Sequence, residues 1–176
     1  MGERLDSNEV GELLDRDAAE RAFQRALHFL AARPRSAFEV RRRLRAAGVE
    51  DQLASEVIDR LRRQGLLDDA QFAAYWVEQR QAFKPRGPRA LRSELRAKGI
   101  AAETMIPAIR AAAEDQGDAA CRAGLREARR RCAYDEIEFT QALGKYLARR
   151  GFDYGVTRAA VAELWLLMQS EAAGKA

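Results

Sequence analysis

The side chains that most often carry out catalytic or metal chemistry are few in this 176-residue chain. There is one histidine, His28, within an apolar stretch, and neither Cys121 nor Cys132 has a histidine nearby in the sequence. Asp68 and Asp69 could hold a metal, but two adjacent carboxylates at a helix start are typical of capping. The chain contains no GxxxxGK[ST], HExxH or GxSxG pattern. We therefore expect no enzyme activity, metal or cofactor, and we interpret the cysteines as reduced packing residues.

The second chemistry to consider is anion binding, because the charges are unevenly spread along the chain. Residues 80–98 hold seven basic side chains and one acidic one, and residues 122–131 hold five basic and one acidic. Residues 1–20, by contrast, hold seven acidic and two basic side chains. The net charge is only +4, yet this asymmetry indicates a partner with an anionic surface, either nucleic acid or an acidic face of a protein.

Most of the candidate contact residues recur around the leucines of three similar helical stretches, while Arg126 and Arg130 come from the basic run over residues 122–131. For any one arginine a solvated helix face is the simpler interpretation, but recurrence at one repeat position favours a binding role. Backbone phosphate contact needs only placed Lys and Arg side chains. The candidates for partner or phosphate binding are Arg42, Arg43, Arg45, Arg86, Arg89, Arg92, Arg96, Lys98, Arg126, Arg130, Lys145, Arg149 and Arg150.

Three glycines mark an internal repeat with periods of 51 and then 52 residues. When Gly48, Gly99 and Gly151 are aligned, apolar residues coincide at the positions eight and four before, one after, and ten and thirteen after. That spacing places the apolar residues on one face of each of two successive helices. Each glycine follows a helical stretch and precedes an aliphatic or aromatic residue, which is typical of a helix C-cap in the left-handed conformation.

Helix start signals agree with this division of the chain. Residues 36–39 form a capping box, Pro88 suits the first helical position, and Asp68 and Asp69 cap the helix that follows. The aromatic residues of that helix, Phe72, Tyr75 and Trp76 among them, have a spacing suited to the core.

The sequence predicts an all-α fold of three tandem three-helix repeats, stacked into an elongated array that could be curved. With 47% hydrophobic and 33% charged residues and four prolines, the composition is that of a helical chain. The expected segments are an acidic N-terminal segment over residues 1–16 that could be disordered, repeats over 17–67, 68–116 and 117–170, and a tail over 171–176.

The same residues strongly resemble the RecX family, bacterial regulators of the RecA recombinase. The resemblance covers roughly residues 22–165 and is most specific in the first two repeats, through Ser36, Glu39, Leu44, Gly65 to Asp69, Phe72, Ala73, Glu94, Leu95, Lys98, Gly99 and Ile100. In the third repeat it depends mainly on spacing, and the acidic N-terminal segment has no clear family counterpart. One departure is Pro107, which suggests a shifted start for the last helix of the second repeat.

The resemblance implies a regulator that binds RecA or lies in the groove of the RecA–DNA filament and limits ATP hydrolysis, strand exchange and filament growth or stability. It carries over no catalytic residue and no cofactor, and it implies a role in recombination, DNA repair and the SOS response. Two alternatives remain open from the residues themselves: a direct DNA-binding regulator that uses helix-turn-helix-like units, and a helical-repeat adaptor with an acidic protein partner. Leucine at the position where a helix-turn-helix needs a small residue, as at Leu44, favours a structural role for the turn.

We expect a monomeric cytoplasmic protein. The sequence has no run of about 18 apolar residues that could span a membrane, and residues 1–17 lack the apolar region of a secretory signal.

Overall fold

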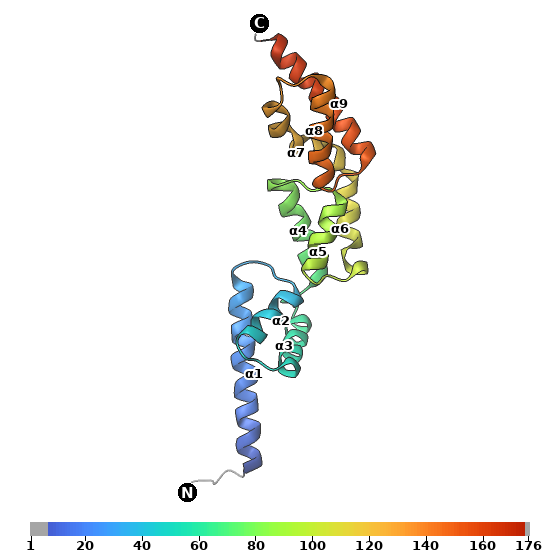
Figure 1. The fold of residues 1–176 in the computed structure, drawn as a ribbon. Helices are drawn as coiled ribbons and strands as arrows, with labels where there is room; N and C mark the ends of the chain where they lie inside the picture. The colour runs from blue at the N-terminus through green and yellow to red at the C-terminus, as the bar shows by residue number, and fades with distance from the viewer. Residues whose placement is uncertain (1–6, 175–176) are drawn as a thin grey trace. The chain divides into compact units, whose positions relative to one another are not determined.

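The computed structural model describes residues 7–174, and all regular structure in that part of the chain is helical. This confirms the predicted all-α class (Figure 1). The helices are α1 (Ser7–Ala31), α2 (Ala37–Ala46), α3 (Asp51–Arg63), α4 (Asp69–Phe83), α5 (Pro88–Ala97), α6 (Ala102–Glu114), α7 (Gln116–Arg130), α8 (Glu136–Arg149) and α9 (Tyr154–Ala173).

The chain divides into two compact units between Phe72 and Ala73. In the first unit α1 packs on α2 and α3, which also pack on each other (Figure 1). Its core gathers around Phe23, Val40 and Leu44, all buried. Residues 7–16 of the acidic N-terminal segment belong to α1, whereas residues 1–6 lie outside the described part of the chain.

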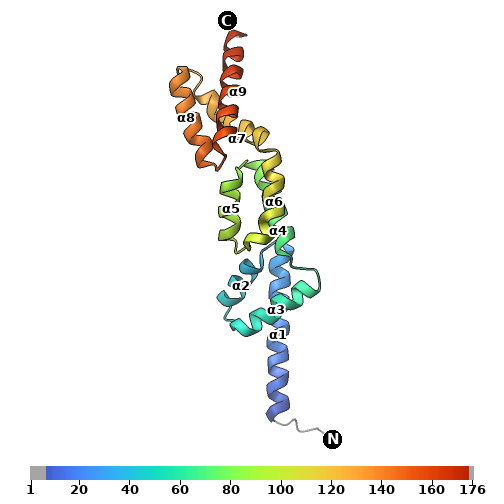
Figure 2. The same ribbon diagram turned by 90° about the vertical axis from the view of Figure 1, so that its right-hand side faces the viewer.

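In the second unit α5 packs on α6, and α7, α8 and α9 pack on one another (Figure 2). Helix α7 approaches α9 closely because it presents small buried residues, including Ala120, Ala123 and Gly124. A Cβ atom added to Gly124 would lie 2.8 Å from Cδ1 of Leu164, so a larger residue does not fit there without movement. Close packing of this kind gives the last three helices one continuous core.

The division into repeats over 17–67, 68–116 and 117–170 is kept as a proposal. Only Asp115 separates α6 from α7, next to the proposed boundary after residue 116. Helix α9 continues into the expected tail as far as Ala173, and residues 175–176 lie outside the described range.

The three aligned glycines end their helices as the sequence predicts. Gly48, Gly99 and Gly151 have φ angles of +77°, +75° and +86°. In each turn the residue after the glycine donates its backbone N–H to the carbonyl of the leucine five residues earlier. This is the Schellman pattern, which satisfies an orphan helix carbonyl and directs the next apolar residue back onto the helix.

The predicted helix starts are also confirmed. Ser36 Oγ accepts the Glu39 backbone N–H, and the Glu39 side chain accepts the Ser36 N–H in return. Pro88 is the first residue of α5, and Asp68 Oδ1 accepts the backbone N–H groups of Ala70 and Gln71 at 2.7 and 3.1 Å. These contacts satisfy N–H groups that would otherwise lack partners at the helix starts.

The suggestion that Pro107 shifts the start of α6 is wrong. The helix begins at Ala102, the position that matches Asp51 in the first repeat, and Pro107 lies inside it. Pro107 removes one donor to the Glu103 carbonyl. Both residues lie on the exposed side of the helix, where water can replace that hydrogen bond.

A backbone junction joins the start of α5 to the end of α8 within the second unit. The N–H groups of Gly87 and Arg89 donate to the carbonyls of Arg150 and Gly151 at 3.0 and 3.2 Å. A Cβ atom on Gly87 would lie 2.2 Å from the Gly151 oxygen, and one on Gly151 would lie 2.3 Å from the Ala90 nitrogen. The junction therefore depends on the absence of side chains at both glycines.

We predict that Gly99→Val lowers the free energy of unfolding by about 2 kcal/mol, because a β-branched residue is strained at positive φ. Urea unfolding followed by tryptophan fluorescence measures this, since Trp76 and Trp165 both belong to the second unit. Gly144→Val is the matched control: Gly144 lies inside α8 with open space around its Cβ position, and we expect little loss there. An equal loss in the two variants would contradict the argument.

Candidate functional site

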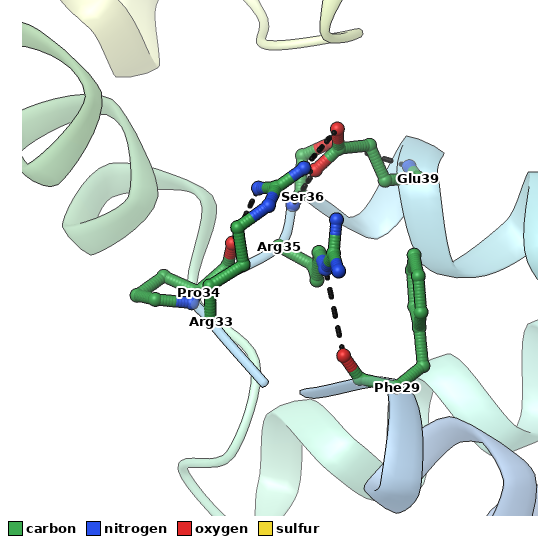
Figure 3. Close-up of polar contacts among 6 residues, drawn as sticks. All are labelled: Phe29, Arg33, Pro34, Arg35, Ser36 and Glu39. Carbon is green, nitrogen blue, oxygen red and sulfur yellow. Dashed lines mark hydrogen bonds and ion pairs between the residues drawn. The ribbon is translucent and has the colours of Figure 1, made fainter. Parts of the chain in front are cut away.

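Some arginines make contacts within the protein and others do not. Those just before α2 make such contacts. The Arg35 guanidinium lies 4.0 Å above the Phe29 ring and its Nε donates to the Phe29 carbonyl at 3.4 Å (Figure 3). Arg33 donates to the Pro34 carbonyl at 2.9 Å and pairs with the buried Glu39 at 3.2 Å (Figure 3). Both arginines therefore hold the α1–α2 connection and are not available to a partner.

The three candidates on α2 have different roles. Arg45 forms a bidentate ion pair with Asp51, whose pKa is lowered by that hydrogen bond. Arg43 and the exposed His28 line a shallow pocket of about 660 Å³ between α1 and α2. The side chain of Arg42 is exposed and makes no hydrogen bond or ion pair with the described residues. Only part of this basic stretch is free to contact an anion.

Glu94, the single acid of residues 80–98, neutralises two of the basic groups around it. Its Oε2 accepts Nε1–H of Trp76 at 2.8 Å and Nε–H of Arg80 at 2.6 Å, and Oε1 lies 3.5 Å from Nε of Arg86. The indole is itself covered by Arg80 at 4.5 Å and Lys98 at 4.7 Å. The expectation that Trp76 belongs to the core is therefore wrong: it is half-buried beneath two cations, an arrangement that cation–π attraction stabilises.

Three candidates on α5 remain free and share one face. Arg89, Arg92 and Arg96 are spaced three and then four residues apart, which places them along one side of the helix. All three are exposed, and none of their guanidinium groups makes a hydrogen bond or ion pair with the described residues. We call these three residues the α5 stripe.

Arg92 and Arg96 also line a groove of about 450 Å³ between α5 and α6, which we call the α5–α6 groove. Arg110 contributes a third cation from α6. Arg110 is not among the candidates that the sequence predicts, because it lies outside both basic runs (residues 80–98 and 122–131) and outside the three repeated helical stretches. Its position one turn after Ile106, on an outward face of α6, is the signal that could have identified it. The remaining residues of the groove are apolar: Ala102, Met105, Ile106, Ile109 and Ala113.

The third-repeat candidates form two smaller groups. Arg126 and Arg130 are exposed on α7, and Arg130 lies 3.8 Å from Glu127. Lys145 and Arg149, one turn apart on α8, line a pocket of about 500 Å³. The structure thus places two cations together on α8.

Arg150 differs from its neighbours because it serves the fold. Its Nη1 donates to the Pro85 carbonyl at 3.0 Å, and its guanidinium lies 4.9 Å from the Tyr146 ring. The side chain is half-buried. It reinforces the junction between α5 and α8, and it is a weaker candidate for partner contact than the sequence suggested.

The described residues contain no cluster of side chains suited to binding a metal ion. Within residues 7–174 no group of three or more His, Cys, Asp or Glu side chains is placed to hold a metal ion. Cys121 and Cys132 are both free thiols. Over the same range no helix combines the length and apolar character needed to cross a membrane.

Comparison with known proteins shows which family the chain resembles. The model of the first three-helix domain of RecX matches residues 22–61, and the model of the second matches residues 68–105. The regulatory protein RecX of Mycobacterium avium is 38% identical over 137 residues, which are 76% of this chain and 78% of that protein. The regulatory protein RecX of Bacillus licheniformis is 32% identical over 163 residues, 92% of this chain, and this chain spans 62% of its length.

A solved structure gives the same result in three dimensions. A crystal structure of regulatory protein RecX matches with a TM-score of 0.80 at 26% sequence identity. The match covers 88% of this chain and 78% of that chain. Because this match covers more of the chain than the two family models do, the structural similarity extends beyond residue 105, where the second family-model match ends.

We predict that Glu94→Gln lowers the free energy of unfolding by about 1–2 kcal/mol, because Arg80 and Arg86 lose a charged acceptor in a partly buried site. The emission of Trp76 should change as well, since its indole N–H donates to that carboxylate. Glu103→Gln on the exposed side of α6 removes the same charge from a side chain that makes no hydrogen bond or ion pair with the described residues, and it should have little effect. Equal unfolding curves for the wild type and Glu94→Gln would disprove a structural role for Glu94.

A second prediction concerns thiol reactivity. Burial, together with the hydrogen bond to Glu163, raises the pKa of Cys121 to about 11, whereas Cys132 is exposed. Because the thiolate is the reactive form, iodoacetamide at pH 8 should modify Cys132 at least about tenfold faster than Cys121. Peptide mass spectrometry over a time course measures both rates. Equal rates at the two cysteines would contradict the placement of Cys121 against Glu163.

Proposed function

Because this chain belongs to the RecX family of regulatory proteins, we propose that it is a non-enzymatic regulator that binds RecA or the RecA–DNA filament. Binding modulates, and mainly inhibits, RecA ATPase activity, strand exchange and filament growth or stability. In this proposal the protein acts in the cytoplasm during recombination and the SOS response, as a monomer and without a cofactor.

The observation that carries the proposal is the α5 stripe. Arg89, Arg92 and Arg96 are exposed cations on one helix face, and Glu94 on the same helix is already engaged by Arg80 and Arg86. Unpaired guanidinium groups in a row attract a negatively charged surface and accelerate its association. A nucleoprotein filament offers such a surface, both in its phosphates and in the acidic side chains of its protein.

A second candidate function is direct DNA binding through helix-turn-helix-like units. It is favoured by the spacing of the α5 stripe, since arginines three and four residues apart can contact successive phosphates. Sequence reading is less well supported, because Arg45 on the corresponding helix of the first repeat is held by Asp51. Retention of short duplexes of different sequence, measured without RecA, separates this candidate from the first.

We predict that the protein inhibits the single-stranded-DNA-dependent ATPase of RecA in a titration. The double change Arg92→Glu/Arg96→Glu should raise the half-inhibitory concentration at least about tenfold, because two attractive charges become repulsive. Circular dichroism should be unchanged, since both side chains are exposed and neither makes a hydrogen bond or ion pair with the described residues.

The matched control is Arg63→Glu/Arg158→Glu, which makes the same change in net charge at exposed positions on α3 and α9. We expect it to raise the half-inhibitory concentration only slightly. No effect of the wild-type protein on RecA would overturn the proposed function. Equal weakening by the two double variants would instead mean that the net charge matters and the α5 stripe does not.

A further inference from the structure

The first and second repeats can be compared residue by residue because their second and third helices have equal lengths and the same offset in the sequence. Helices α2 and α5 each have 10 residues, α3 and α6 each have 13, and both pairs are offset by 51 positions. The N-cap residues of α3 and α6 have nearly the same backbone angles, φ −62° and ψ 150° against φ −64° and ψ 152°. Residues 51 positions apart therefore occupy equivalent backbone positions in the two repeats.

In the first repeat two arginines of α2 are bound by the start of α3. Arg41 Nη1 donates to Ser55 Oγ at 2.7 Å. Arg45 donates to both carboxylate oxygens of Asp51, with Nη2 to Oδ2 at 2.8 Å. The hydrogen bond raises the pKa of Arg45 and lowers the pKa of Asp51, so both groups stay charged. The first repeat thus provides a carboxylate and a hydroxyl group as internal partners for these two arginines.

In the second repeat the arginines remain but their partners are gone. Arg92 and Arg96 stand 51 positions after Arg41 and Arg45. Ala102 and Ile106 take the places of Asp51 and Ser55. With no oxygen at either place, Arg92 and Arg96 have no partner among the described residues, and Ile106 is 53% exposed. The α5–α6 groove is the space that this replacement leaves open.

We propose that the α5–α6 groove binds an acidic segment of a protein partner, with a carboxylate on Arg96 and an aliphatic side chain against Ile106. The carboxylate would occupy the place that Asp51 fills in the first repeat, and a bidentate bond to a guanidinium is strong and directional. This identification of the ligand class deepens the proposed function and rests on it for the partner's role.

The apolar floor of the groove argues for a peptide and against a nucleic acid backbone. Met105 and Ile109 are 3% exposed, Ile106 is 53% exposed, and all three line the groove beside the arginines, so the surface there is aliphatic. Burying an aliphatic side chain of the partner there is favourable because it removes apolar surface from water. A sugar–phosphate chain would instead lose hydrogen bonds to water without replacing them. A volume of about 450 Å³ suits a few side chains of a docked segment.

The third repeat does not reproduce this groove. With the period of 52, the counterparts of Arg92 and Arg96 are Gly144 and Ala148, so the equivalent cations are absent. Of the three aligned positions, only those of the second repeat combine two unpaired arginines with an aliphatic neighbour. We therefore assign binding to the α5–α6 groove alone. A single pair of substitutions there can give Arg92 and Arg96 internal partners and block the site.

The decisive variant is Ala102→Asp/Ile106→Ser, which transplants the internal partners of the first repeat into the second. Asp at the first residue of α6 also suits the positive end of the helix dipole, so the fold should be retained. The probes are fluorescein-labelled twelve-residue peptides of Glu-Glu-Leu repeats, the same peptide with Gln in place of Glu, and a single-stranded oligothymidylate. Anisotropy titrations without RecA measure each affinity.

We expect the Glu-containing peptide to bind the wild-type protein, and its affinity to fall at least about tenfold in Ala102→Asp/Ile106→Ser. The Gln-containing peptide should bind neither protein. Ala159→Asp, which adds one negative charge at an exposed position of α9, is the control and should bind as the wild type does. If the double variant fails to fold, Ala102→Asp alone gives the same test at Arg96.

Unchanged peptide affinity in the double variant would overturn the proposal. Loss of oligothymidylate binding with no loss of peptide binding would also overturn it, in favour of phosphate. Peptide binding that depends on the open groove, together with no effect of the wild-type protein on RecA, would leave this proposal standing and remove only the proposed function. RecA inhibition without any peptide binding would remove this proposal alone.

Discussion

The structure depends on one backbone constraint, the positive φ angle of the glycine that ends the middle helix of each repeat. At Gly48, Gly99 and Gly151 the chain leaves the helix in the left-handed conformation, and the next residue bonds back to the leucine carbonyl. The turn fixes where the following helix begins, and it sets the first turn of that helix beside the last turns of the one before. A residue three positions before the glycine therefore faces one three positions after it, and a residue seven positions before faces one seven positions after, as in the first repeat.

That constraint has three different outcomes in one chain. In the first repeat the facing positions hold Arg45 and Asp51, and an ion pair closes the turn. In the second they hold Arg96 and Ala102, and a basic groove remains. In the third the turn itself becomes a contact, since the carbonyl of Gly151 accepts the N–H of a residue at the start of α5. The same backbone thus serves stability, recognition and the docking of neighbouring helices, depending on a few side chains.

The sequence was sufficient for the fold because fold signals are local. Leucines four residues before each glycine are fully buried, and the capping contacts of Ser36, Pro88 and Asp68 occur where their residue types predict. The state of the candidate site could not be predicted in the same way. Arg45 and Asp51 are six residues apart and meet only across the glycine turn, outside the three- and four-residue spacings of a helix. The position of Trp76 beneath Arg80 and Lys98 likewise depends on how α4 lies against α5.

A count of basic residues is therefore a poor measure of anion binding, and the difference between repeats is more informative than their similarity. The first repeat shows that a guanidinium at this position accepts a carboxylate when one is present. The second repeat keeps the guanidinium and replaces the carboxylate with a methyl group, which leaves the cation exposed and gains no internal contact for it. A closed first repeat also removes a competing site of similar geometry, because Arg41 and Arg45 are already satisfied. Specificity for the α5–α6 groove then has two sources: the second repeat can bind a carboxylate, and the first repeat cannot.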